Sequence, residues 1–133
     1  MRRIGIERFM FGSDGPHVMV QPYVRSVDGH GERSLVFIDG KLSHAIRKTP
    51  RFGTDHERVS EAMPIDEIER SFAERVMACV DTELLYARVD IARDERGAPM
   101  VMELELIEPS LFLRQHPPAA VLLATAIVRA ALR

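Results

Sequence analysis

The sequence predicts an α+β domain, an antiparallel sheet of about five strands with helices packed on one face. Two observations predict the sheet: Asp39-Gly40 and Arg96-Gly97 each stand between two runs of strand-forming residues, as hairpin turns do. A third observation predicts the helices, because two other segments carry apolar residues at helical spacing or are rich in alanine and leucine. The chain has 133 residues, which suits a single domain over residues 1–133.

The first half of the chain is expected to be mostly strand. Residues 18–27 are predicted to form a strand, and the proline at position 22 indicates an edge strand or a hinge. Residues 32–38 and 41–48 form the first predicted hairpin. Residues 49–62 are polar without a clear period, which predicts a long loop.

The second half combines helices with the second hairpin. A helix is expected to begin near Ser60 or Ala62, with Pro64 in its first turn. Its predicted buried stripe consists of Ile65, Ile68, Phe72, Val76 and Cys79. Residues 84–92 and 99–107 form the second hairpin, and residues 118–132 form the last helix.

Composition excludes several classes of protein. The formal net charge of -2 gives no basic surface for nucleic acid, and lysine occurs only at Lys41 and Lys48. The single cysteine, Cys79, rules out an internal disulfide and a cysteine-based zinc site, and it is expected in the core. No apolar stretch reaches the roughly 20 residues of a membrane span, and no signal peptide is apparent. A cytoplasmic protein is expected.

The second hairpin gathers acidic side chains. A symmetric turn about Arg96-Gly97 places Asp90 opposite Glu103 and Arg88 opposite Glu105, all on one face of the sheet. Like charges placed opposite each other destabilise a sheet by up to about 1 kcal/mol. A divalent cation such as magnesium would remove that cost, since it prefers oxygen ligands. A solvated polar face with an Arg88–Glu105 salt bridge is the alternative, and both interpretations remain open.

Five segments resemble the ATP-grasp superfamily in order and spacing. They are MVQPY at 19–23, GERSLVFIDG at 31–40, LSHAIRK at 42–48, LYARVD at 85–90 and MELELIEPSL at 102–111. The similarity is to the C-terminal half of the glutathione-synthetase-like branch, which includes D-cycloserine-forming cyclo-ligases. It implies an ATP- and magnesium-dependent carboxylate–amine ligase that works through an acyl phosphate.

The resemblance also implies roles for individual residues. Asp90, Glu103 and Glu105 would hold two magnesium ions, although many relatives have asparagine at the third position. Arg88, Arg33 and Arg47 would neutralise phosphate or carboxylate charge as catalytic residues. Nucleotide contacts would come from Gln21, Pro22 and Tyr23 at the adenine, and from Lys48 at the phosphates.

The resemblance further implies that half of the enzyme is absent, namely the N-terminal substrate domain and the lysine-bearing subdomain. The expected function is therefore a ligase fragment that is incomplete on its own. The alternative is a non-catalytic remnant that binds metal or nucleotide weakly or acts only through protein contacts. Expected partners are a nucleotide, a small amino-acid-like carboxylate and a second polypeptide (another copy or the missing half), but neither nucleic acid nor a membrane.

Overall fold

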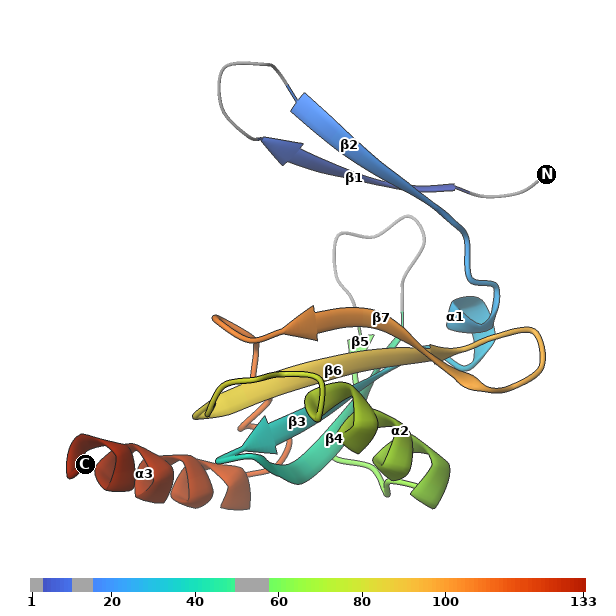
Figure 1. Cartoon of the computed structure of the whole chain (residues 1–133). Helices are drawn as coiled ribbons and strands as arrows, with labels where there is room; N and C mark the ends of the chain where they lie inside the picture. Colours follow the sequence, from blue (N-terminus) through green and yellow to red (C-terminus); the bar gives the residue numbers. More distant parts are fainter. Residues whose placement is uncertain (1–3, 11–15, 50–57) are drawn as a thin grey trace.

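The computed structural model describes residues 4–10, 16–49 and 58–133, and describes side chains from residue 22 onwards (Figure 1). Its elements are β1 (Ile4–Met10), β2 (Pro16–Pro22), α1 (Ser26–Gly29), β3 (Glu32–Ile38), β4 (Lys41–Thr49), β5 (Arg58–Val59), α2 (Glu67–Met77), β6 (Tyr86–Arg93), β7 (Pro99–Glu105) and α3 (Pro118–Ala131). A five-stranded antiparallel sheet has the order β5-β4-β3-β6-β7, and β1 pairs with β2 in a separate two-stranded sheet. The predicted α+β class is confirmed.

Both predicted hairpins are present. Asp39 and Gly40 have φ of 51° and 72° between β3 and β4, which is the conformation of a tight primed turn. Gly97 has φ of 81° in the turn between β6 and β7. The turn residues therefore correctly predict that β3 is joined to β4 and β6 to β7.

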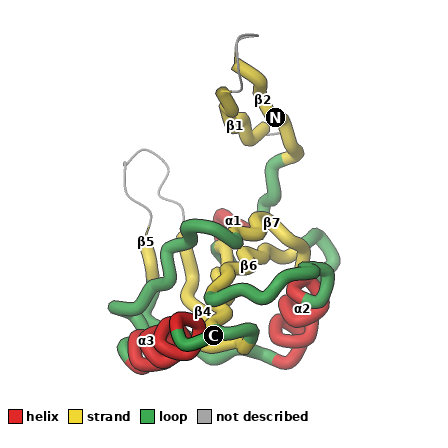
Figure 2. Tube along the Cα trace, turned by 60° about the vertical axis from the view of Figure 1, so that its left-hand side comes forward, coloured by secondary structure: helices red, strands yellow, loops and turns green. Residues whose placement is uncertain are grey.

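The core lies on both sides of the five-stranded sheet. Leu35 and Phe37 of β3 pack on one face in a cluster that includes Ala73 of α2. Val36 and Ile38, which alternate with them, pack on the other face with Ala119 and Ala126 of α3. The sheet thus lies between α2 and α3 (Figure 2), whereas the sequence suggested helices on one face. We call the two sides the α2 face and the α3 face.

The strand expected over residues 18–27 is shorter and pairs elsewhere. β2 ends at Pro22, whose partner is Ile4 of β1, and the short helix α1 follows. The fifth strand of the main sheet is instead β5, which lies inside the segment predicted to be a loop. The remainder of that predicted loop, residues 50–57, lies outside the described residues.

Helix α2 begins later than predicted. Its N-cap is Asp66, whose carboxylate accepts a hydrogen bond from the Glu69 N–H at 2.7 Å, and neither Ser60 nor Ala62 caps it. The expected buried stripe is also partly wrong, because Ile68 is 60% exposed and Cys79 is exposed. The helix turns Glu69 and Ala73 toward the sheet, since Glu69 pairs with a buried arginine there.

Helix α3 agrees with its prediction to within one residue. It follows residues 111–113, which pack with it against the α3 face. Across the described residues, no helix has the length and apolar character needed to cross a membrane.

Candidate metal and phosphate site

The second hairpin forms the predicted pairs. Asp90 lies opposite Glu103 and Arg88 lies opposite Glu105. β3 lies on the other side of β6, where Ser34 pairs with Asp90 and Val36 with Arg88. These side chains therefore belong to the α3 face, as alternation along the strands requires.

Arg88 lies among the three carboxylates. Its Nε donates to Asp90 Oδ1 at 2.8 Å and its Nη2 to Asp90 Oδ2 at 2.7 Å. Nη2 also lies 3.0 Å from Glu103 Oε2, and Nη1 lies 3.0 Å from Glu105 Oε2. The ring of Phe112 lies 5.7 Å from the guanidinium carbon, close enough for a cation–π contact. The Arg88–Glu105 salt bridge of the alternative interpretation is present, and the guanidinium lies between the carboxylates.

Lys48 joins the same group from β4. Its Nζ lies 2.8 Å from Asp90 Oδ2 and also pairs with Glu32, the residue opposite it in β3. Sequence reasoning missed Glu32, because a symmetric turn about Asp39-Gly40 would place it opposite Arg47, and an irregularity between Val36 and Phe37 shifts its partner to Lys48. The complete set, here named the acidic cluster, is Glu32, Lys48, Arg88, Asp90, Glu103 and Glu105.

The acidic cluster has an excess of negative charge. Four carboxylates face two cations, so with all groups ionised its net charge is 2 - 4 = -2. Asp90 is fully buried, which opposes ionisation, but hydrogen bonds from Arg88 and the charge of Lys48 lower its pKa overall. Glu103 behaves oppositely, because partial burial and then the charges of Glu105 and Asp90 raise its pKa. The excess negative charge of the acidic cluster therefore makes Glu103 harder to ionise.

The oxygen donors and the negative charge of the acidic cluster suit a divalent cation. Its side chains, however, are not arranged to hold one. In the part of the chain that the structure describes, no group of three or more histidine, cysteine, aspartate or glutamate side chains is spaced to hold a metal ion. Arg88 accounts for this, since it takes both oxygens of Asp90. Glu103 and Glu105 remain 50% and 30% exposed, so their oxygens are open to solvent.

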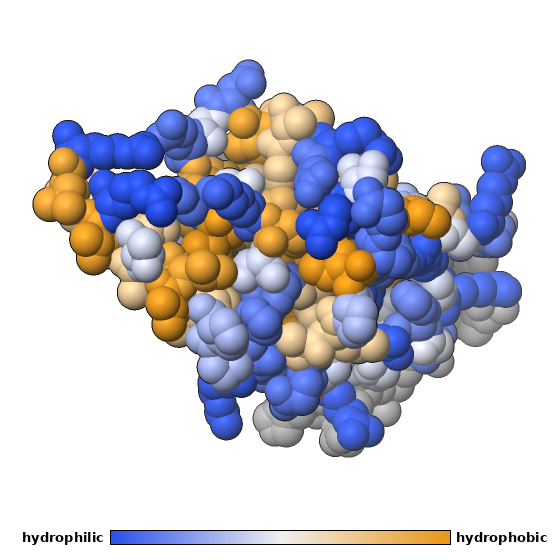
Figure 3. All heavy atoms as spheres, turned by 90° about the horizontal axis from the view of Figure 1, so that it is seen from below, coloured by the Kyte–Doolittle hydropathy of each residue, from blue (hydrophilic) through white to orange (hydrophobic). Residues whose placement is uncertain are grey.

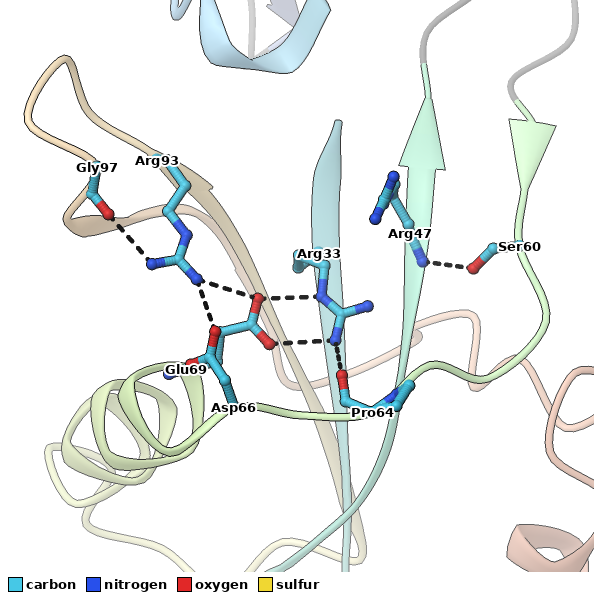
Figure 4. Close-up of polar contacts among 8 residues, drawn as sticks. All are labelled: Arg33, Arg47, Ser60, Pro64, Asp66, Glu69, Arg93 and Gly97. Atoms are coloured by element: carbon cyan, nitrogen blue, oxygen red, sulfur yellow. Dashed lines mark hydrogen bonds and ion pairs between the residues drawn. The ribbon is translucent and has the colours of Figure 1, made fainter. Parts of the chain in front are cut away.

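The strand register places Arg33 and Arg47 on the α2 face, opposite to the face of Arg88. Figure 4 shows the surroundings of these two arginines. Arg33 donates from Nε and Nη2 to the two oxygens of Glu69, both at 3.1 Å, and from Nη2 to the Pro64 carbonyl at 2.7 Å. Arg47 pairs with Arg33 across β3 and β4, and its backbone N–H donates to Ser60 Oγ at 2.9 Å. The structure therefore does not bring these two arginines into the acidic cluster, and their contact with phosphate stays a prediction.

The predicted adenine contacts lie at the end of β2. Gln21 and Pro22 pair with Gly5 and Ile4 of β1, and the side chain of Gln21 is outside the described ones. The Tyr23 hydroxyl donates to Asp28 of the segment that forms α1. Their role toward a nucleotide stays a prediction.

Two residues of the α3 face lie beside the acidic cluster, and the sequence patterns did not identify them as part of the site. Phe112 covers Arg88 from a backbone with φ of 48°, a conformation that periodicity does not reveal. His44 is buried, as a structural histidine should be, with Nε2 3.1 Å from the Leu111 carbonyl and its ring stacked on His116 at 4.8 Å. Together they tie the segment before α3 to the sheet beside the acidic cluster.

Known proteins share this fold and sequence. The chain is 41% identical over 127 residues to the cycloserine biosynthesis protein DcsG of Streptomyces lavendulae, which covers 86% of this chain and 42% of DcsG. The crystal structure of D-cycloserine synthetase DcsG superposes with a TM-score of 0.74 at 38% identity, covering 88% of this chain and 43% of that one. The structure of the ATP-grasp ligase PsnB with a minimal precursor has the same fold at a TM-score of 0.52 and 20% identity, covering 84% of this chain and 38% of that one. These similarities support the resemblance to ATP-grasp proteins that the sequence motifs indicate.

Another member of this fold is the D-alanine–D-alanine ligase of Bacillus anthracis in complex with ATP, with a TM-score of 0.61 and 21% identity over 87% of this chain and 41% of that one. No family model matches the sequence. The chain spans about two fifths of the length of these ATP-grasp proteins.

Proposed function

We propose that this chain supplies the metal- and phosphate-binding part of a carboxylate–amine ligase that uses ATP and forms an acyl phosphate. The observation that carries the proposal is the acidic cluster, in which four carboxylates and two buried cations lie on one face of the sheet with a net charge of -2. The 41% identity to a cycloserine biosynthesis protein supports it.

The roles of the residues follow from their charge and exposure. Asp90, Glu103 and Glu105 would hold magnesium. A bound magnesium ion would neutralise the negative charge of the phosphates. Arg88 and Lys48 would provide positive charge to the transferred phosphoryl group or to the carboxylate that accepts it. Phosphoryl transfer depends mainly on positioning and charge neutralisation, so the proposal requires no nucleophilic side chain.

The substrate we propose is a small amino-acid-like carboxylate. A D-cycloserine synthetase and a D-alanine–D-alanine ligase are among the structures similar to this chain. Since the chain spans about two fifths of these proteins, the rest of the site would come from polypeptide outside these 133 residues.

Calorimetric titration tests the metal and nucleotide part of this proposal. Magnesium, ATP and magnesium with ATP are each titrated into the native chain, Asp90→Asn and Glu103→Gln. We expect magnesium to tighten ATP binding, and each substitution to weaken magnesium binding by at least about tenfold. The matched control is Glu95→Gln, in the turn beyond β6, which should bind as the native chain does. Equal magnesium affinity in the native chain and Glu103→Gln contradicts the proposal.

A non-catalytic remnant is the second candidate, and the position of Arg88 favours it. The Arg88 guanidinium already contacts Asp90, Glu103 and Glu105, so it occupies the position among them that a metal ion would take. If this is the function, the native chain binds no magnesium, whereas Arg88→Gln, which takes the net charge from -2 to -3, gains magnesium binding. A ligase function predicts measurable binding by the native chain.

A further inference from the structure

His44 of β4 is a buried histidine on the α3 face, the side of the sheet that carries the acidic cluster. It pairs with Val36 of β3, and Val36 pairs with Arg88 of β6, so the three side chains form one row across that face. His44 is 3% exposed, and Arg88 is the cation that contacts three carboxylates of the acidic cluster. Val36 alone separates the two residues along this row.

Both ring nitrogens of His44 have partners. Nε2 lies 3.1 Å from the Leu111 carbonyl oxygen, which can only accept, so Nε2 carries the proton and donates it. Nδ1 lies 3.1 Å from Ser43 Oγ and accepts from that hydroxyl. Burial, and then the charge of His116, lower the pKa of His44, which favours the neutral ring that these hydrogen bonds require. The hydrogen bond to Leu111 is therefore present at neutral pH.

The Leu111 carbonyl begins a tight turn, residues 111–116, that returns to His44. Within it the Phe112 carbonyl accepts from the His116 N–H at 3.2 Å. The His116 ring stacks on the His44 ring with 4.8 Å between the centroids. His44 thus holds this turn at both ends, by a hydrogen bond at Leu111 and by a ring stack at His116.

Phe112, inside this turn, covers Arg88. Its φ of 48° is a left-handed conformation that a bulky residue adopts only where its surroundings impose it. The Arg88 guanidinium carbon lies 5.7 Å from the centroid of the Phe112 ring. The carboxylates alone leave several positions open to a long side chain, and the ring excludes those that would overlap it. The turn therefore helps to decide where the guanidinium lies.

We propose that His44 is a positioning residue for Arg88. By holding the 111–116 turn on the sheet, it keeps the Phe112 ring over Arg88 and fixes the guanidinium among the carboxylates of the acidic cluster. The inference rests on the proposed function only in the role given to Arg88 toward phosphate or carboxylate. The positioning itself belongs to the chain without any ligand.

Nuclear magnetic resonance of the Arg88 guanidinium tests this role in the whole 133-residue chain, without magnesium or ATP. The measured quantity is the rate of rotation about the Nε–Cζ bond, a motion of the folded chain that requires the guanidinium to release its acceptors. His44→Phe keeps a ring for His116 but cannot donate to Leu111, whereas His44→Gln keeps a donor near the position of Nε2. We expect rotation at least about tenfold faster in His44→Phe, equal to about 1.4 kcal/mol, and a native rate in His44→Gln.

A second variant and a control separate positioning from packing. Phe112→Leu removes the ring from Arg88 directly, so it should accelerate rotation as much as His44→Phe does. The two changes combined should accelerate it no further, since both act through the same contact. Leu123→Ala, a partly buried position of α3 in the same core, is the matched control. It should lower the free energy of unfolding and leave the rotation rate native.

A native rotation rate in His44→Phe or in Phe112→Leu overturns the proposal. Equal acceleration in Leu123→Ala also overturns it, because the effect would then be a general loss of packing. The same holds for equal acceleration in His44→Gln, since the donated hydrogen bond would then play no part. Because no ligand is added, a native chain that binds no magnesium would contradict the proposed function and leave this result unchanged.

Discussion

At the scale of single residues, Arg88 and Asp90 form the buried centre of the acidic cluster. Arg88 is 6% exposed and Asp90 is fully buried, so both charges have lost nearly all their water. A buried ion pair adds little net stability over an apolar pair, but removal of one partner leaves an uncompensated charge. The cost of a substitution here therefore depends strongly on which charge remains.

We predict that Arg88→Met destabilises the chain by about 1–3 kcal/mol, because the buried Asp90 loses two hydrogen bonds while Lys48 remains paired with it. Urea unfolding at neutral pH measures the change. Arg70→Met is the matched control, since Arg70 pairs with Glu74 at 3.8 Å on the surface and should contribute less than about 1 kcal/mol. Equal losses of unfolding free energy in the two variants would show that the buried ion pair contributes no more to stability than the exposed one.

For single residues, the sequence correctly predicted which side chains share a face of the sheet, because side chains alternate between the two faces along a strand. A symmetric turn about Arg96-Gly97 predicted the pairing of Asp90 with Glu103 correctly, although near the turn Arg93 pairs with Pro99 and the register shifts by one residue between Asp90 and Ile91. The position of the Arg88 guanidinium did not follow, because a long flexible side chain can turn toward any of several carboxylates. The pairing of Arg33 with Glu69 was also out of reach, since it joins residues from separate elements.

At the scale of elements, the start of α2 shows how a capping residue sets a helix. Asp66 accepts from the Glu69 N–H and also pairs with Arg93 at 2.9 Å. The hydrogen bond from the Glu69 N–H, supported by Arg93, lowers the pKa of Asp66 below its usual 3.8. A carboxylate with a lowered folded pKa stabilises the protein above its unfolded pKa, and that contribution disappears as pH falls through the folded pKa.

Asp66→Ala should therefore cost about 1 kcal/mol at neutral pH, the usual value of an N-cap. The difference from the native chain should shrink as pH falls below about 3.8, because the unfolded chain then binds a proton at Asp66, and it should be lost once pH has fallen through the lower folded pKa. Thermal or urea unfolding across the acid range measures both effects. Asp66→Asn is the control, because asparagine still caps the helix but cannot titrate. A native-to-alanine difference that stays constant down to pH 2 would contradict this account.

The elements that sequence predicted well are those with local signals. The turns at Asp39-Gly40 and Gly97 carry their conformation in their own residues, so both hairpins were found. The pairing of β2 with β1 was not found, although only residues 11–15 separate the two strands, because residues 4–10 were not recognised as a strand. The same holds for β5, whose two residues give no periodic pattern.

At the scale of the whole molecule, the outer surface of α3 is unusually apolar for a helix at the surface. Its exposed apolar residues are Val121, Leu122, Ile127, Val128 and Leu132. Figure 3, which views the molecule from below, shows apolar side chains gathered on this side. Patches of this kind mark contact surfaces or sites of association. Polypeptide that completes an ATP-grasp ligase is the occupant we propose for it, since the chain spans only 43% of D-cycloserine synthetase.

We predict that the isolated chain associates as its concentration rises, because the apolar side of α3 has no cover. Sedimentation velocity over a hundredfold range of concentration measures this. Leu122→Glu combined with Val128→Glu should give a monomer, while Ile68→Glu, an equally exposed apolar position on α2, should not. A native sedimentation coefficient that is independent of concentration would count against the prediction.

The overall class could be predicted from sequence, but the layering could not. Local patterns gave hairpins and helices, and these suffice for an α+β domain. The placement of α2 and α3 on opposite faces depends on contacts between distant segments, which local patterns do not give. Within α2, Phe72 and Val76 of the predicted stripe do pack against the core, and Glu69 is buried beside them by its ion pair with Arg33.

Two consecutive residues of β3 place their charged side chains on opposite faces of the sheet. Glu32 points to the α3 face and Arg33, the next residue, to the α2 face. Because side chains alternate with a period of two, one residue inserted between Arg33 and the turn at Asp39 would send Arg33 among the carboxylates and Glu32 among the guanidinium groups. Insertions and deletions of one residue in this strand should therefore exchange the chemistry of the two faces, whereas changes of two residues should preserve it.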